Sequence, residues 1–119
     1  MKFGEYFRNL RNSRAVTQQQ IADVIGKNPM LISNVENNKN GPFTEEDLGK
    51  ISNYLNLSKK DRKELFVEAA KENGKLPQYI WEYFIRHEEI FTLVEIITEK
   101  KLNNEQLLKI IDYIIKMTE

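Results

Sequence analysis

Thr17-Gln18-Gln19-Gln20-Ile21-Ala22-Asp23-Val24-Ile25-Gly26 decides the fold, together with the stretch that follows it, Lys27-Asn28-Pro29-Met30-Leu31-Ile32-Ser33-Asn34-Val35-Glu36. Thr17 and Gln20 form a capping-box pattern, in which both side chains satisfy unpaired amides at the start of a helix. Gly26 ends that helix, because glycine readily adopts the left-handed conformation found at helix C-termini. Asn28 and Pro29 begin a second helix as its N-cap and first residue. The stretch therefore predicts two short helices joined by a turn of about four residues.

The second of these helices has one apolar side and one free side. Leu31, Ile32 and Val35 recur at helical spacing and predict the side that packs against the rest of the fold. Polar residues at the start of the first helix suit a phosphate contact, and the free side of the second helix suits base edges. Two short helices at this spacing, with glycine in the turn, are typical of a helix-turn-helix.

Apolar spacing and capping residues predict three more short helices around this motif. Phe3, Phe7 and Leu10, with Tyr6 beside them, form the apolar stripe of a first helix that ends near Arg14. We therefore expect an all-α fold, with five helices packed as a bundle in residues 1–74. Two later helices open at Thr44 and Ser58, and their predicted core residues are Leu48, Ile51, Leu55, Leu65, Phe66 and Ala69.

A second segment, residues 75–119, predicts about three further helices with strongly apolar sides. Pro77 opens an aromatic-rich helix, and Asn103 with Gln106 opens the last one. The apolar arc of that last helix is too wide for a lone surface helix, so another surface must cover it. We expect this helical tail to dimerise or to bind a partner, through Trp81, Phe84, Ile90, Leu93, Val94, Ile97, Leu107, Ile111, Ile114 and Ile115.

Residues 3–57 resemble the Cro/C1-type (XRE) family of helix-turn-helix regulators. The stretch from Val16 to Gly26 is similar to the first half of the family's motif, and Lys27 to Lys39 is similar to its recognition helix and exit loop. The segment from Leu57 through Leu76-Pro77 is similar to the tail of some short regulators of this family. The resemblance implies double-stranded DNA as a partner and a recognition helix that lies in the major groove.

The family's functional positions carry over to this sequence one by one. The resemblance implies that Gln18 contacts a phosphate and braces the recognition helix, and that Asn34 pairs with adenine. It implies that Arg11 and Glu36 tie the first helix to the end of the third. Taken alone, Ser33 and Asn34 could be ordinary exposed polar residues, and we expect Lys27 and Lys39 to be solvated in the free protein. The set implied for DNA binding is Gln18, Lys27, Asn28, Pro29, Met30, Ser33, Asn34, Asn37 and Lys39.

Three features depart from the family pattern. Asn38 stands where the family usually has glycine, and asparagine is the next-best residue for a left-handed backbone at a helix end. The reading side has no arginine, so the commonest guanine contact is missing and A·T-rich sites are favoured. Pro29 occupies a potential base-contacting position without a hydrogen-bond donor. These departures bear on the specificity of readout rather than on the fold.

The charge balance allows only a local DNA-binding patch. Lys and Arg total 18, as do Asp and Glu, and residues 1–57 hold seven basic and six acidic side chains. A chain without bulk positive charge must attract phosphates through a few local cations.

Composition indicates a soluble globular chain. Of its 119 residues, 40% are apolar and 30% are charged, and no apolar run approaches the roughly 20 residues of a membrane-spanning helix. The N-terminus is charged where a signal peptide would be apolar, and the absence of cysteine suits a reducing compartment. We therefore expect a cytoplasmic protein that does not bind membranes.

No residue pattern indicates catalysis, a cofactor or a metal site. The five glycines form no phosphate-binding loop or dinucleotide fingerprint. His87 is the only histidine and has no cysteine as a co-ligand, so we interpret it as a solvated side chain. The aromatic cluster around Trp81 could line a pocket, but core or interface packing explains its helical spacing more simply. We expect a protein that is not an enzyme and has no cofactor.

Two classes of function remain open. The favoured hypothesis is a repressor or autorepressor that binds a pseudo-palindromic operator as a homodimer, because two recognition helices about 34 Å apart give a useful affinity. The alternative is an inhibitor or antitoxin-type module from a phage or mobile element, as the resemblance allows, which binds a protein partner. A small-molecule or peptide sensor would need a pocket between the tail helices, and the tail is short for one.

Overall fold

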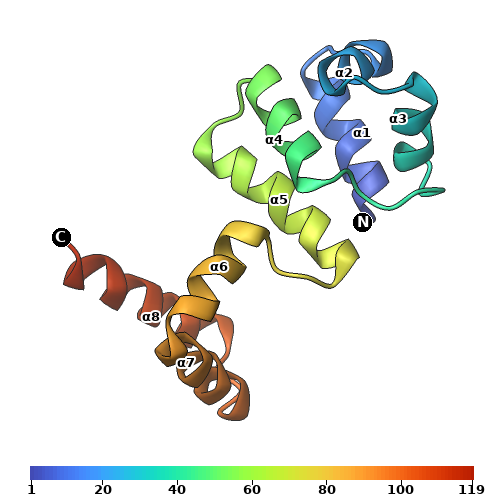
Figure 1. The fold of residues 1–119 in the computed structure, drawn as a ribbon. Helices are drawn as coiled ribbons and strands as arrows, with labels where there is room; N and C mark the ends of the chain where they lie inside the picture. The colour runs from blue at the N-terminus through green and yellow to red at the C-terminus, as the bar shows by residue number, and fades with distance from the viewer. The chain divides into compact units, whose positions relative to one another are not determined.

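The computed structural model describes all residues, 1–119, and consists of eight α-helices without a strand (Figure 1). The predicted all-α fold is confirmed, with five helices in the N-terminal part and three behind them. None of the eight helices combines the length and the apolar composition that spanning a bilayer requires. The helices are α1 (Phe3–Ser13), α2 (Gln18–Ile25), α3 (Pro29–Glu36), α4 (Glu45–Tyr54), α5 (Lys59–Asn73), α6 (Gln78–Arg86), α7 (Glu88–Glu99) and α8 (Asn104–Met117).

The helix boundaries follow the capping residues in the sequence. The predicted capping box at α2 is confirmed: the Gln20 N–H donates to Thr17 Oγ1 at 3.1 Å, and the Thr17 N–H donates to Gln20 Oε1 at 2.8 Å. Asn103 and Gln106 form the same box at the start of α8. Gly26 ends α2 in the left-handed conformation, with φ at +66°. Caps of this kind contribute about 1 kcal/mol each, so these helix ends are set by local sequence.

Three phenylalanine rings form the centre of the hydrophobic core between α1 and α5. The Phe7 and Phe43 rings meet edge to face with centroids 4.8 Å apart, and the Phe3 ring stacks on Phe7 at 6.0 Å. Burying each large apolar side chain contributes about 1.5–3 kcal/mol, so this core holds α1 to α5 together. The other core residues are Ile21, Ala22, Ile25, Ile32, Val35, Leu48, Ile51, Leu55, Leu65, Phe66 and Ala69.

The chain divides into two compact units, Met1–Tyr79 and Ile80–Glu119. In the first unit, α2 packs against α3 and α4, while α1 packs against α3 and α5. Within this unit, α3 and the turn between α4 and α5 lie on opposite sides (Figure 1). The surface formed by α3 is therefore distinct from the surface at the start of α5.

The second unit holds most of α6 together with α7 and α8, and it has no buried residue. The Trp81, Phe84 and Phe91 rings contact one another with centroids 5.6–6.5 Å apart, yet Trp81 remains 42% exposed. The tail surface predicted from the sequence is therefore largely exposed within this unit. Among its members, Phe84, Ile90, Ile97 and Leu107 are half-buried, whereas Trp81, Leu93, Val94, Ile111, Ile114 and Ile115 are exposed.

Candidate nucleic-acid interface

A short turn between Ile25 and Pro29 fixes α3 relative to α2. The left-handed backbone of Gly26 reverses the chain direction without the steric cost that a side chain would add. Asn28 then caps α3, because its Oδ1 accepts a hydrogen bond from the Met30 N–H at 2.8 Å. Pro29 stands at the first helical position, where a missing N–H costs nothing. The result is a helix-turn-helix whose second helix has a defined entry angle.

The outer side of α3 carries the side chains implied for base contact. Met30 is 64% exposed, and Ser33 and Asn34 are half-buried. The Asn34 side-chain amide makes no hydrogen bond within the protein, whereas its main-chain carbonyl accepts from the N–H groups of Lys39 and Asn40 at 2.8 and 3.1 Å. The backbone at Asn34 is therefore fixed while its amide is free to pair with a base edge.

The inner end of α3 is anchored through a buried carboxylate. Glu36 is 1% exposed, and Arg11 donates to both of its oxygens, from Nε at 2.7 Å and from a terminal guanidinium nitrogen at 2.9 Å. Gln18 Nε2 donates to the same carboxylate at 3.2 Å, and Arg8 Nε does so at 3.4 Å. The structure thus joins Arg11 to Glu36, and it brings Gln18 from the start of α2 to the end of α3.

These contacts keep Glu36 ionised. Burial alone would raise the pKa of Glu36, but hydrogen bonds from Arg11, Gln18 and Arg8 and the charge of Arg11 lower it below 4.5. The hydrogen bond between Arg11 and Glu36 also raises the pKa of the Arg11 guanidinium group. A buried charge with this many donors is a fixed anchor for the recognition helix.

Lys27 is exposed, as expected, and it also forms an ion pair that the sequence did not predict. Its ammonium lies 2.5 Å from a carboxylate oxygen of Asp47, whose side chain is only 6% exposed. The physical reason is that a nearly buried carboxylate needs a nearby cation. Lys27 therefore links the turn to the start of α4, and it can reach a phosphate only by sharing or leaving Asp47.

The exit from α3 exposes the residues implied for phosphate contact. Asn37 and Lys39 are both exposed, and Lys39 has no ion pair in the structure. Asn37 accepts a hydrogen bond from Arg8 at 2.5 Å and donates one to Ser33 Oγ at 3.3 Å. Asn38 has φ at +59°, which confirms the left-handed backbone expected where the family usually has glycine. A phosphate near this loop would meet Lys39 as its first free cation.

Sequence reasoning missed Arg8, and the signal for it was present. Arg8 lies one helical turn before Arg11 on α1, so both guanidinium groups extend over the same end of α3. Through its bonds to Glu36 and Asn37, Arg8 connects the buried anchor with the exit loop. Arg8 is therefore part of the support of the candidate interface.

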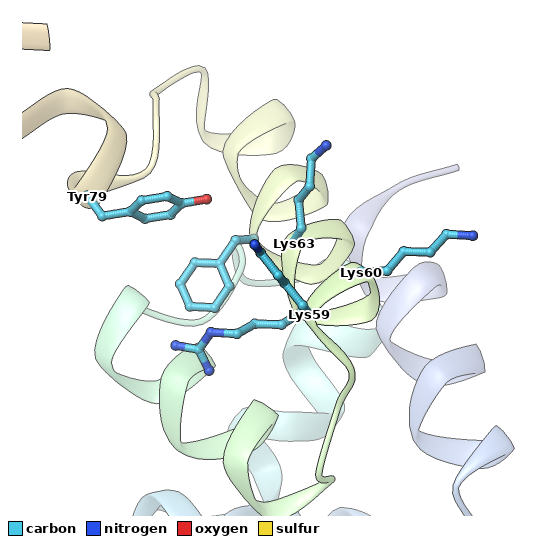
Figure 2. Close-up of a pocket in the computed structure, with 6 residues that line it drawn as sticks. Lys59, Lys60, Lys63 and Tyr79 are labelled. Atoms are coloured by element: carbon cyan, nitrogen blue, oxygen red, sulfur yellow. The ribbon is translucent and has the colours of Figure 1, made fainter. Parts of the chain in front are cut away.

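A cluster of cations at the start of α5 was also not predicted from the sequence. Its signal was the run Lys59-Lys60-Asp61-Arg62-Lys63. The Tyr79 hydroxyl points toward the Lys59 and Lys63 side chains (Figure 2). Lys60 extends in the opposite direction, away from Tyr79. Because this cluster and α3 lie on opposite sides of the unit (Figure 1), it is separate from the α3 surface. The open hollow there measures about 790 Å³ and is lined by Lys59, Lys60, Arg62, Lys63, Phe66 and Tyr79.

A short capped helix, a glycine turn and an anchored second helix with a free outer side define a DNA-binding helix-turn-helix domain. Comparison with known families agrees: residues 7–61 match the family described as helix-turn-helix. These residues form a helix-turn-helix domain of the Cro/C1 type, the XRE family, as the resemblance in the sequence predicted. Neither the curated proteins nor the solved structures gave a match to the chain.

Proposed function

We propose that the protein is a transcriptional regulator, acting as a repressor or autorepressor, that binds a pseudo-palindromic operator as a homodimer. The observation that carries this proposal is the contrast between the two sides of α3. Its inner end is anchored by the buried Glu36, while the Asn34 amide and the Met30 side chain on the outer side have no partner in the protein. An unpaired amide on a rigidly held helix retains its full capacity to recognise a base.

The side chains on α3 favour A·T base pairs. The Asn34 amide can pair with the N6 and N7 positions of adenine, and Met30 can contact a thymine methyl group. No arginine stands on this side to read guanine. Lys39 and Asn37 would contact the phosphates beside the groove, which positions the helix without reading sequence.

A homodimer supplies the affinity that one such domain lacks. The unit Met1–Tyr79 holds thirteen basic and ten acidic residues, so few phosphate contacts are available to each copy. Two recognition helices about 34 Å apart read two half-sites together. The uncovered tail helices are the surface through which we propose that two copies associate. We also propose that the protein has no catalytic activity and acts in the compartment that holds the DNA.

Selection of genomic fragments by the purified protein tests this function. Fragments retained at physiological salt are sequenced for the wild type and for a Met30→Ala/Asn34→Ala variant. We expect a recurrent two-fold motif for the wild type and no enrichment for the variant. A matched control is Leu76→Ala/Asn73→Ala, which removes one exposed apolar side chain and one exposed amide from positions outside α3 and outside the tail helices. If the control also loses enrichment, or a folded wild type enriches nothing, the proposal is wrong.

A second candidate is a module that binds another protein, and the exposed apolar side chains of the tail favour it. Salt separates the two functions. DNA affinity falls steeply with added salt because counterions are released from phosphates, whereas an apolar protein interface responds weakly. A salt-insensitive complex with a protein partner, together with absent DNA enrichment, would favour this second function.

A further inference from the structure

Helix α8 has an apolar stripe that the other helices of its unit leave exposed. Leu108, Ile111 and Ile115 recur at i, i+3 and i+7 and are 63%, 51% and 53% exposed. Residues at this spacing share one side of a helix. The half-buried residues of α8, Leu107 and Ile110, lie at other positions around the helix axis. We call Leu108, Ile111 and Ile115 the α8 stripe.

A row of charges with alternating sign flanks the α8 stripe. Glu105, Lys109, Asp112 and Lys116 recur at i, i+4, i+7 and i+11, so they also share one side of the helix. Lys116 and Asp112 form an exposed ion pair at 3.0 Å. The order of charges along the row is negative, positive, negative, positive. When a second copy of the helix runs in the opposite direction, its charges therefore have the opposite order. The row is therefore complementary to itself when two copies run antiparallel.

We propose that two copies of the chain pair through α8, antiparallel, with Ile111 of each copy at the two-fold axis. This inference rests on the homodimer proposed above and specifies its contact. In this register Leu108 lies opposite the partner's Ile114 and one residue from the partner's Ile115. Antiparallel helices also bring the same flank of each copy together, so Glu105 comes within one residue of the position opposite the partner's Lys116, and Asp112 within one residue of that opposite the partner's Lys109. This offset is about 1.5 Å along the helix, which long side chains span, so the apolar contact and the charge pairing are both compatible with the register.

The exposed apolar area of the tail is sufficient for a stable dimer. Thirteen large apolar side chains between Trp81 and Met117 are each 40–68% exposed. At roughly 150–250 Å² for a large side chain, they present on the order of 1,000 Å², whereas a stable interface buries about 800 Å² per partner. Six of the thirteen lie on α8 and hold roughly half of this area, so α8 would form the centre of an interface that exposed side chains of the other tail helices extend. A second copy offers a surface of the same size and character.

The charges on α7 argue against that helix as the symmetric contact. Its four charged residues, Glu88, Glu89, Glu95 and Glu99, are all acidic. Two copies of α7 that met through the side carrying Glu88, Glu95 and Glu99 would bring like charges together, and α7 has no cation of its own to pair with them. Helix α8 is the tail helix with both an exposed apolar stripe and a self-complementary flank.

Cysteine cross-linking tests the contact directly, because the chain has no cysteine of its own. In the intact protein, Ile111→Cys places two thiols beside the proposed axis, within the 4.4–6.8 Å Cα separation that a disulfide spans. Under mild oxidation we expect disulfide-linked dimer to form at least about tenfold faster than for Val94→Cys on α7. Equal rates for the two variants would overturn the α8 contact.

Charge reversal tests the register without depending on one variant's folding. Lys109→Glu/Lys116→Glu makes the flank acidic, and Glu105→Lys/Asp112→Lys makes it basic. We expect each double variant alone to associate at least about tenfold more weakly than the wild type by sedimentation, and a mixture of the two to form a heterodimer. Loss of association by each variant without recovery on mixing would overturn the antiparallel register.

Failure of this contact can be distinguished from failure of the homodimer. If the wild type sediments as a dimer and both double variants remain equally dimeric, the homodimer stands and the α8 contact is wrong. If the wild type is a monomer at tens of micromolar, the homodimer and the α8 contact are both wrong. DNA enrichment by that monomer would still support the helix-turn-helix function.

Discussion

Arg11 donates hydrogen bonds to both carboxylate oxygens of Glu36, at 2.7 and 2.9 Å, and also to the main-chain carbonyl of Val16 at 2.8 Å. One guanidinium group therefore joins α1, the segment before α2, and the end of α3. Gln18 completes this arrangement from the first turn of α2. The position of the recognition helix thus depends on a polar network as well as on the apolar core.

Replacing Arg11 should destabilise the fold strongly. Arg11→Ala leaves the carboxylate of Glu36 buried with only Arg8 and Gln18 as donors, and breaking a buried ion pair costs about 3–5 kcal/mol. We expect the free energy of unfolding in urea to fall by about 3 kcal/mol. The control is Arg14→Ala, because the Arg14–Asp61 pair is 34% and 39% exposed and should contribute less than about 1 kcal/mol. Similar losses for both variants would contradict the role given to Glu36.

Acid should weaken the fold through Glu36. Its pKa is below 4.5 in the folded protein, whereas the unfolded chain titrates near that ordinary value, so between the two values the unfolded state binds more protons. The contribution of the carboxylate is complete above about pH 4.5 and is lost as the pH falls through the lowered pKa. We expect the free energy of unfolding to decrease more steeply from about pH 6 to about pH 3 in the wild type than in Glu36→Gln. Parallel curves would show that Glu36 is not responsible.

Gly4 is required by the close approach of α1 to the end of α3. A Cβ at this position would lie 2.3 Å from the carbonyl oxygen of Val35 and 2.8 Å from that of Glu36, and neither backbone atom can move freely. We expect Gly4→Ala to lower the free energy of unfolding by about 2 kcal/mol. Gly49 inside α4 is the control, because a Cβ there meets only the end of a side chain, at 3.9 Å. Gly49→Ala should therefore stabilise the protein, by about 0.5–1 kcal/mol in thermal or urea unfolding.

Asn38 has two roles at the end of α3. Its backbone is left-handed, with φ at +59°, and its Oδ1 accepts a hydrogen bond from the Gly4 N–H at 3.2 Å. Asn38→Ala loses the hydrogen bond and retains the steric cost, so we expect a loss of about 1–2 kcal/mol in urea unfolding. Asn38→Gly loses the same bond but relieves the backbone, and it should cost less than the alanine variant. A glycine variant that is less stable than the alanine variant would contradict this account.

The helices could be predicted from the sequence because their ends are determined locally. Thr17, Gly26 and Asn103 act within one turn of their own position, so their effect is visible in a short stretch of sequence. Spacing also predicted the core, since Phe3 and Phe7 share a helix side. Both signals have a range of a few residues, which is the range that sequence patterns report.

The contacts that the sequence could not show are those between distant residues. The Arg8–Glu36 and Lys27–Asp47 pairs each join different helices or turns, and their existence depends on how the helices pack. The same limit applies to Lys59 and Lys63, which border a hollow with Tyr79 only because α6 begins beside them. Charge runs in the sequence identified the residue types but not the surface on which they gather.

The salt dependence of DNA affinity should show which cations contact phosphates and how many copies of the protein bind one site. Lys39 is exposed, has no ion pair and follows the recognition helix, so we expect Lys39→Ala to weaken binding to all sequences alike. Each lost phosphate contact reduces the slope of log affinity against log salt by about 0.9, so a homodimer should lose about 2 and a monomer about 1. Asn34→Ala should leave the slope unchanged and instead weaken binding to the preferred site by about 1–3 kcal/mol per half-site. Lys60→Ala, in the first turn of α5, is the control. If it changes the slope as much as Lys39→Ala does, the DNA surface includes the start of α5, and α3 is not the only side that faces the duplex.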